Sequence, residues 1–210
     1  TIFQRNITMS LICKDDETLR RTSVRKLKPL AFNLNLIQQL SELSWLPVDN
    51  NVSIAEMEQA FRSIVRTKRF SRWTDLLLVS VGNAAFCRLF NGDLWAMLTV
   101  FAATLLGFLV KQQLSRLKYN PLGVIILSAF AASMAAACAV IFQLGSTPQI
   151  ALATSVLFLV PGVQMINSIM DLMHGHILMG ISRGVHSIMM ISCITIGLSA
   201  TMLIVGVNSL

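Results

Sequence analysis

Long apolar runs occupy the last two thirds of the chain, whereas the first third mixes polar and apolar positions. A helix needs about 20 apolar residues to cross a bilayer. Five runs approach or reach that length, at about residues 73–90, 94–114, 122–144, from 149 onward, and 177–207. The first run is the weakest, because it is short and contains Asp75 and Arg88. The pattern predicts an α-helical polytopic membrane protein with five transmembrane helices over residues 73–210.

Residues 1–72 have the pattern of a small α+β domain. Residues 1–28 predict a β-hairpin, because two β-rich segments flank the turn-like sequence KDDE. Residues 34–44 predict a helix with its leucines on one face, and the chain is expected to break after it at Pro47, Asp49, Asn50 and Asn51. The chain begins at Thr1 within the expected sheet. We therefore expect an N-terminal portion to precede it or to have been removed.

A second helix is expected to begin after Ser53. Ser53 and Glu56 fit a capping box, in which each side chain accepts a hydrogen bond from the other residue's backbone N–H. Glu58 and Arg62 stand four residues apart, which favours an ion pair on the helix surface. The helix leads into the basic residues Arg66, Lys68, Arg69 and Arg72. This basic end is expected to lie against the inner membrane surface.

The charge distribution predicts an orientation. Residues 1–72 hold 12 of the 17 Lys and Arg residues, and only 13% of the whole chain is charged. The loop after the second run adds Lys111, Arg116 and Lys118, whereas the loops at 91–93 and 145–149 have no basic residue. By the positive-inside rule the N-terminus is cytoplasmic and the C-terminus outside. Because the basic residues flank apolar runs, a membrane surface explains the net charge of +7 better than nucleic acid does.

The run that begins near residue 149 contains a Pro-Gly pair, Pro161 and Gly162. Proline removes a backbone donor, and glycine weakens a helix. The pair predicts a kink or a break near the middle of the membrane. A broken helix exposes backbone groups that transporters use to hold ions and carboxylates, whereas a mere kink is absorbed by neighbouring helices. The pair alone does not decide between the two.

Polar residues follow this pair at helical spacing. Asn167, Asp171 and His174 share one face of a helix. After Gly175, a second face carries His176, Gly180, Arg183 and Ser187. We expect a helical hairpin, packed through Gly175 and Gly180, in which the two polar faces meet.

Asp171 and Arg183 are the expected ion pair of this hairpin. Within a membrane domain such groups suggest function, with a proton exchanging at Asp171, His174 or His176 and a carboxylate binding Arg183. The plain alternative places these side chains at the headgroup level, where they only anchor the helix ends.

No other chemistry is supported by motif. His174 and His176 form an HxH with no further ligand nearby, so we expect no metal and no cofactor. No nucleophile motif is present, so an enzyme is not expected. The four cysteines are widely spaced and predict no disulfide frame.

Two further pairs of polar residues have weaker signals. Arg88 and Asp93 could gate the outer side or form a surface pair. Thr154 and Ser155 could line a cavity or bond to their own helix.

The stretch LVPGVQMINSIMDLMHGHILMGISR resembles the threonine/serine exporter family. The matching positions are Pro161, Gly162, Asn167, Asp171, Gly175, His176, Gly180 and Arg183. The resemblance covers essentially the whole chain. It implies a small cytoplasmic N-terminal domain that leads through a basic helix into the membrane spans.

The resemblance also implies a function and a partner. The family exists as single chains of about ten spans and as pairs of a five-span subunit with a smaller membrane subunit. This chain is similar to the larger subunit of the split type. Its implied cargo is a small carboxylate, either a succinate-like dicarboxylate or threonine and serine, with proton coupling and contacts to Asn167, Asp171 and Arg183. Self-association is left open. The alternative is a non-transporting scaffold or sensor whose cytoplasmic domain binds a partner.

Overall fold

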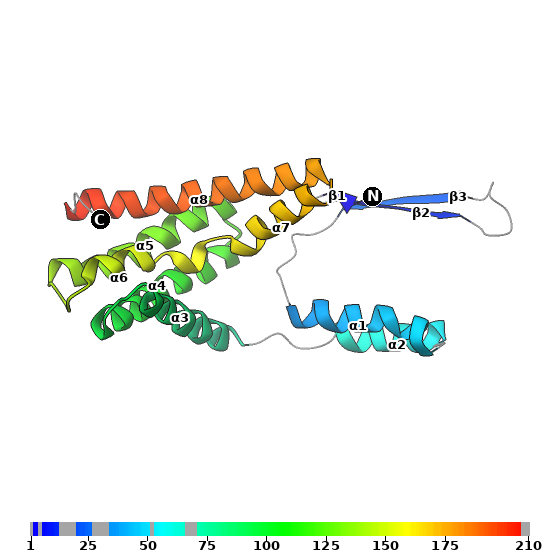
Figure 1. Ribbon diagram of the computed structural model, residues 1–210, viewed down its shortest axis with the longest axis horizontal. Coiled ribbons are helices and arrows are strands. Elements are labelled where there is room, and N and C mark those ends of the chain that lie inside the picture. The colour runs from blue at the N-terminus through cyan, green and yellow to red at the C-terminus, as the bar shows by residue number, and fades with distance from the viewer. Residues whose placement is uncertain are drawn as a thin grey trace. The chain divides into compact units, whose positions relative to one another are not determined.

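The computed structural model describes residues 2–3, 6–12, 20–26, 34–50, 53–65 and 71–206. The chain separates into two compact units, Thr1–Phe70 and Ser71–Leu210. Most of the structure is helical, and Figure 1 labels the elements of both units.

The first unit contains three short antiparallel strands, β1 (Ile2–Phe3), β2 (Asn6–Ile12) and β3 (Arg20–Lys26). β2 lies between the other two, and its register with β3 runs from Asn6 opposite Lys26 to Ile12 opposite Arg20. The predicted pairing of the two longer strands is confirmed. The KDDE turn lies outside the described residues.

Helices α1 (Leu34–Asn50) and α2 (Ile54–Val65) complete the first unit. α1 is longer than the predicted 34–44: it continues past Pro47 and ends at Asn50, within the expected break. Pro47 lies in the last turn, where its missing N–H removes one backbone hydrogen bond without ending the helix. The capping box is confirmed, with Ser53 N donating to Glu56 Oε2 at 2.9 Å and Glu56 N donating to Ser53 Oγ at 3.3 Å. Arg66, Lys68 and Arg69 lie outside the described residues.

Within residues 71–206, the described part of the second unit, all regular elements are helices. In order these are α3 (Arg72–Leu89), α4 (Leu94–Arg116), α5 (Pro121–Ile141), α6 (Pro148–Thr154), the 3₁₀ helix η1 (Leu157–Leu159), α7 (Gly162–Met173) and α8 (Ile177–Val205). Each predicted apolar run corresponds to one helix, except the fourth, which is divided into α6, η1 and α7.

The structure confirms part of the predicted number of spans. Within the described residues, α4, α5 and α8 are long and apolar enough to cross a membrane, and the bent pair from Pro148 to Met173 can count as a fourth span. α3 does not reach this standard, because its 18 residues include Arg72, Asp75 and Arg88. Three to four of the five expected spans are therefore supported, and the span at α3 stays a prediction.

α5 lies at the centre of the second unit, packed between α4 and α8 (Figure 1). The contact between α5 and α8 includes a buried hydrogen bond of 2.6 Å between the hydroxyls of Ser133 and Thr201. Alanines such as Ala129, Ala132 and Ala136 are fully buried along α5. Small side chains let membrane helices approach closely, which explains the tight packing of this alanine-rich helix.

Four of these helices end in the same way. After α3, α4, α5 and α7 the chain turns through a residue of positive φ, namely Asn91, Lys118, Gln143 and Gly175. At each end, the next residue donates its N–H back to a carbonyl five positions earlier, as Gly92 does to Cys87 at 2.9 Å. This Schellman arrangement satisfies carbonyls that the helix end leaves free.

Candidate functional site

The fourth run is broken at the predicted place. The helical segments before and after Pro161 are bent by 60°. Between them the backbone bonds run from Ser155 N to Ala151 O, and then from Leu159 N to Val156 O and Val160 N to Leu157 O. Among the described residues this leaves the carbonyls of Thr154 and Ser155 without a backbone donor. The break is therefore a change of helix direction and not a small kink.

Asn83 of α3 supplies donors to these carbonyls. Its Nδ2 lies 3.2 Å from Thr154 O, 3.5 Å from Ser155 O and 2.7 Å from Thr104 Oγ1 of α4. Asn83 is 3% exposed and Thr104 is fully buried. Sequence reasoning missed Asn83, because a lone asparagine in an apolar run gives no sign of a partner 71 residues away.

Thr154 and Ser155 also bond within their own segment. Thr154 Oγ1 donates to Ile150 O at 2.7 Å, and Ser155 Oγ donates to Leu152 O at 2.7 Å. The sequence left open whether these hydroxyls line a cavity or bond to their own helix, and the structure shows the second. A groove of about 450 Å³ lies beside the break, lined by Asn83, Phe158 and Gly162 among mainly apolar side chains.

The expected helical hairpin is formed by α7 and α8. Its turn covers residues 174–176, where Gly175 has a φ of +79°. His176 N donates to Asp171 O at 2.8 Å and Gly175 N donates to Leu172 O at 3.1 Å, which completes the Schellman motif. An added Cβ at Gly175 would meet nothing within 4 Å. Gly175 thus serves the hairpin through its conformation and not through close packing.

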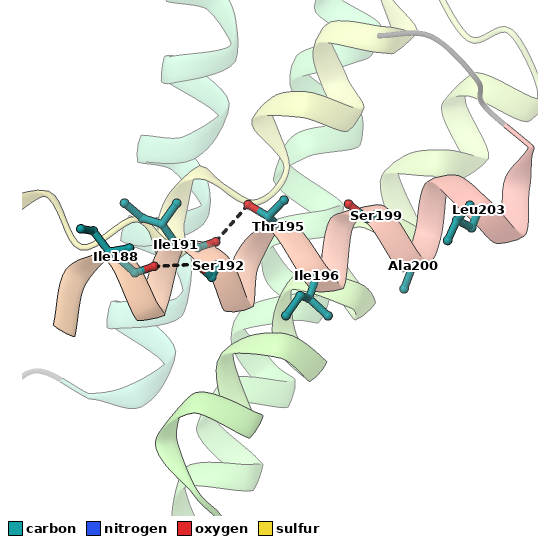
Figure 2. A pocket seen from close by; sticks show the side chains of 8 residues that line it. All are labelled: Ile188, Ile191, Ser192, Thr195, Ile196, Ser199, Ala200 and Leu203. Atoms are coloured by element: carbon teal, nitrogen blue, oxygen red, sulfur yellow. Dashed lines mark hydrogen bonds between the residues drawn. The ribbon is translucent and has the colours of Figure 1, made fainter. Parts of the chain in front are cut away.

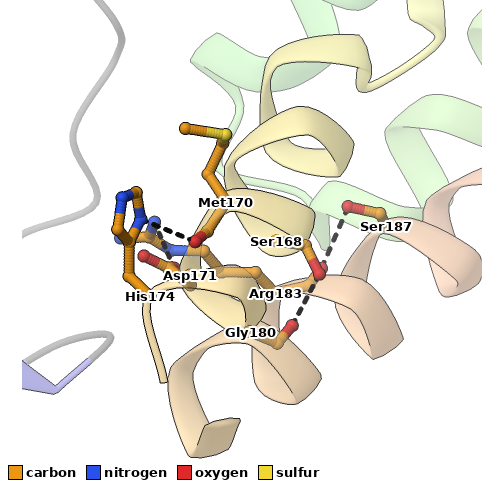
Figure 3. A network of polar contacts seen from close by, with 7 residues as sticks. All are labelled: Ser168, Met170, Asp171, His174, Gly180, Arg183 and Ser187. Carbon is orange, nitrogen blue, oxygen red and sulfur yellow. Dashed lines mark hydrogen bonds and ion pairs between the residues drawn. The ribbon is translucent and has the colours of Figure 1, made fainter. Parts of the chain in front are cut away.

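Asp171 and Arg183 meet across the hairpin. Arg183 donates from one terminal guanidinium nitrogen to Asp171 Oδ2 at 2.7 Å, as Figure 3 shows. The Arg183 side chain is 34% exposed and the Asp171 side chain 22%, so the pair is accessible but partly desolvated. A carboxylate and a guanidinium held this way attract each other more strongly than in water.

Ser168 and Gly180 bring the two helices together next to this pair (Figure 3). Ser168 is 6% exposed, and its Oγ donates to Gly180 O at 2.6 Å. A Cβ at Gly180 would lie 2.6 Å from Leu172 Cγ and 2.9 Å from Ser168 O. The close approach therefore requires glycine at position 180. The neighbouring Ser187 donates to Arg183 O at 2.9 Å, within α8.

The other expected site residues do not join the ion pair. The His174 ring nitrogen Nδ1 lies 2.8 Å from Met170 O, and His174 and His176 are both exposed. Asn167 is half-buried and makes no side-chain hydrogen bond within the described part of the chain. The hairpin thus brings together Asp171 and Arg183, but not the two histidines.

Gln164 is a second residue that sequence reasoning passed over. Its Oε1 is buried and has no hydrogen-bond partner among the described residues. Gln164, Asn167 and Asp171 are spaced by three and four residues, so they share one face of α7. This face connects the break to the ion pair, which lies nine residues or about 14 Å beyond Gly162 along the helix axis.

A second groove, of about 630 Å³, lies on α8 alone (Figure 2). It extends along the helix from Ile188 to Leu203. The hydroxyls of Ser192 and Thr195 donate to carbonyls of their own helix, at 3.0 and 3.1 Å. The groove therefore offers apolar surface and no converging polar groups.

Arg88 and Asp93 do not pair with each other. Arg88 donates to Gly92 O at 3.1 Å, while Asp93 caps α4 by accepting from Ala96 N at 2.7 Å. Asp93 also accepts from Ser146 N at 2.7 Å, which ties the loop after α5 to the start of α4. Among the residues described, no three His, Cys, Asp or Glu side chains gather in a way that could hold a metal ion.

Comparison with models of protein families identifies the family of this chain. The model of the threonine/serine exporter family, ThrE, matches residues 1–205. The chain belongs to the threonine/serine exporter family. This membership places it among membrane transporters and not among enzymes, and the apolar helices make it a multi-pass membrane protein.

Two curated relatives are similar over most of this chain. A protein of Escherichia coli K12 named "Probable succinate transporter subunit YjjP" is 34% identical over 175 residues, covering 81% of this chain and 66% of the relative. A Klebsiella aerogenes protein of the same name is 31% identical over 194 residues, covering 90% of this chain and 73% of the relative. No solved structure matches the chain significantly.

Proposed function

We propose that this chain is the larger subunit of a bacterial inner-membrane exporter of small carboxylates. The observation that carries the proposal is the Asp171–Arg183 pair, joined at 2.7 Å across the α7–α8 hairpin of a threonine/serine exporter chain. The cargo is a succinate-like dicarboxylate, as the names of the two relatives suggest, or threonine and serine. A smaller membrane subunit of the same family completes the transporter.

The topology we propose has five spans, with α3 as the first and the N-terminus in the cytoplasm. Residues 1–72 then form a cytoplasmic α+β domain. In this orientation the α7–α8 turn faces the cytoplasm, so the ion pair lies at the side from which cargo is collected. Arg88 at one end of α3 and Arg72 at the other can reach the headgroup regions, which makes a charged span tolerable.

The chemistry of the pair supports coupling to protons. A guanidinium presents donors in a fork that matches a carboxylate, so cargo can replace Asp171 on Arg183. A proton on Asp171 removes the competing charge and frees Arg183 for cargo. The proton enters from the outer side, and Asp171 releases it to the cytoplasm once cargo has bound to Arg183. The cargo then leaves on the outer side, and Arg183 pairs with Asp171 again until the next proton arrives. The cycle exchanges one proton inward for one cargo carboxylate outward.

The polar face of α7 provides a path between the pair and the break. Asn167 has free donors and acceptors in the described structure, and the Gln164 acceptor is buried without a partner. Both can bind cargo groups after they leave Arg183. His174 and His176, exposed at the turn, can accept protons from Asp171 and pass them to the cytoplasm.

The test is efflux of labelled succinate and threonine from proteoliposomes containing the full-length chain, with and without its smaller subunit. We expect efflux of one cargo, only with both subunits, and stimulation by an inward proton gradient. Asp171→Asn should abolish the stimulation, and Arg183→Gln should abolish efflux. Arg116→Gln, at the exposed end of α4, is the control and should transport normally. If Asp171→Asn and Arg183→Gln both transport like the parent, the assignment of the site to this pair is wrong. A parent that transports neither cargo, with both subunits inserted, favours the scaffold alternative.

A further inference from the structure

We propose that Asn83 is the positioning residue that sets the geometry of the helix break. This inference rests on the proposed transport function and extends it to α3, the helix of lowest hydropathy in the second unit. Asn83 would touch no cargo. It would act through the backbone carbonyls that the break leaves free.

The first argument is the hydrogen-bond geometry at the break. A continuous helix would pair the carbonyls of Thr154 and Ser155 with N–H groups four residues later. The described break does not, and the Asn83 amide lies 3.2 and 3.5 Å from these two oxygens. In a bilayer no water can replace such a donor, so losing it drives the backbone to find another pairing. The simplest pairing is the helix that the break interrupts.

The second argument is that Asn83 is buried and is bonded to a second helix. Asn83 is 3% exposed, and its amide also donates to Thr104 Oγ1 at 2.7 Å. Thr104 is fully buried in α4, so the amide is held from a second helix and cannot rotate away. Three segments, α3, α4 and the end of α6, thus meet at one amide group. Such contacts specify one arrangement of the helices and not merely their association.

The aromatic packing carries the third step. Phe158 of η1 lies edge-on to Phe108 of α4, with ring centroids 6.1 Å apart. Phe158 and Asn83 line the same groove beside Gly162. The break is therefore held on its polar side by Asn83 and on its apolar side by Phe108. Loss of the amide leaves only the apolar contact, which does not fix the direction of the carbonyls.

The variant Asn83→Leu tests the proposal, with Ser80→Ala as the matched control. Ser80 is also fully buried in α3, but its hydroxyl donates to Leu76 O of its own helix. We expect Asn83→Leu to lower the maximal efflux rate about ten-fold with little change in KM, because a misplacement of about 1 Å can cost up to about 100-fold. Thr104→Val should lower the rate less, and Thr104→Ser should restore it.

A second readout is independent of transport. Val160 borders the groove and is 43% exposed, so Val160→Cys can be labelled with a maleimide after Cys13 and Cys138 are replaced by serine. We expect Asn83→Leu to change the labelling rate several-fold and Ser80→Ala to leave it unchanged.

The outcomes separate the two proposals. An Asn83→Leu chain with parental labelling, or with parental efflux, overturns the positioning role. A rate that falls only as the amount of folded protein falls overturns it as well. A parent that transports neither succinate nor threonine overturns the proposed function, while the labelling comparison still decides what Asn83 does.

Discussion

At the scale of single residues, Gln164 is the clearest case in which stability and transport favour different side chains. A buried amide oxygen without a donor costs about 1–3 kcal/mol in proteins. Membrane helices keep such groups where cargo or ions pass. The same face of α7 holds Asn167 and Asp171, which makes a functional reason for the cost more convincing than a packing defect.

Gln164→Leu should therefore stabilise the protein while slowing export. We expect the free energy of unfolding to rise by about 1–3 kcal/mol, since the unpaired acceptor disappears. Gln112 is the matched control, because its side-chain nitrogen already donates to Arg72 O at 3.3 Å. Gln112→Leu should lose stability and keep transport. Thermal unfolding in detergent and efflux rates measure both effects, and an unstable Gln164→Leu chain would contradict the reading.

At the scale of elements, the hairpin depends on the distance between α7 and α8. Gly180→Ala places a methyl group 2.9 Å from the backbone oxygen of Ser168, which cannot move without moving α7. We expect a destabilisation of about 1–3 kcal/mol, as for other overpacked sites. The separation should also lengthen the Asp171–Arg183 contact and reduce efflux.

Gly123→Ala is the control for this change. Position 123 lies in α5, and an added Cβ there meets nothing within 4 Å. We expect its melting temperature to equal or exceed that of the parent, because alanine favours a helix over glycine. Equal melting temperatures and efflux for Gly180→Ala and the parent would show that the hairpin tolerates a wider spacing.

The loop that joins α5 to α6 gives a pH-dependent prediction. Backbone N–H groups of Ala96 and then of Ser146 donate to Asp93 and lower the pKa of that carboxyl below its usual range. Because the folded pKa is the lower one, the stabilisation is present above the unfolded pKa of about 4 and is lost as the pH falls through the folded value.

Asp93→Asn should remove this part of the acid sensitivity. Thermal unfolding in detergent between about pH 6 and pH 3 measures the difference between the parent and the variant. We expect the parent to lose more stability than Asp93→Asn on acidification. Parallel pH profiles would show that the two hydrogen bonds do not depend on the charge of Asp93.

Sequence patterns predicted the elements better than their contacts. Apolar length placed α4, α5 and α8, and Pro161 with Gly162 placed the break, because these signals are local. The i, i+4 spacing and the short turn also predicted the contact between Asp171 and Arg183, since both residues belong to one hairpin. Asn83 could not be found this way, because its partners lie 21 to 72 residues further along the chain. The end of α1 was placed only approximately, because the helix continues past Pro47 and ends at Asn50, within the expected break.

At the scale of the whole molecule, the role of α3 decides the topology. Five spans place the two ends of the chain on opposite sides of the membrane, whereas four spans place them on the same side. Phosphatase and fluorescent-protein reporters fused after Leu210 distinguish the two cases. We expect an active phosphatase and a dark fluorescent reporter, as for an external C-terminus. The opposite result would make α3 an interfacial helix and would remove the first span from the proposal.

The Asp171–Arg183 contact also bears on how the protein is made. The two charges are 12 residues apart in the chain and meet within a single hairpin. They can therefore neutralise each other as soon as α7 and α8 leave the ribosome, before any other subunit is present. Insertion machinery then receives a nearly neutral pair of helices in place of two isolated charges, each of which is costly at membrane depth. The residues proposed to move cargo would thus also ease the entry of their own helices into the bilayer.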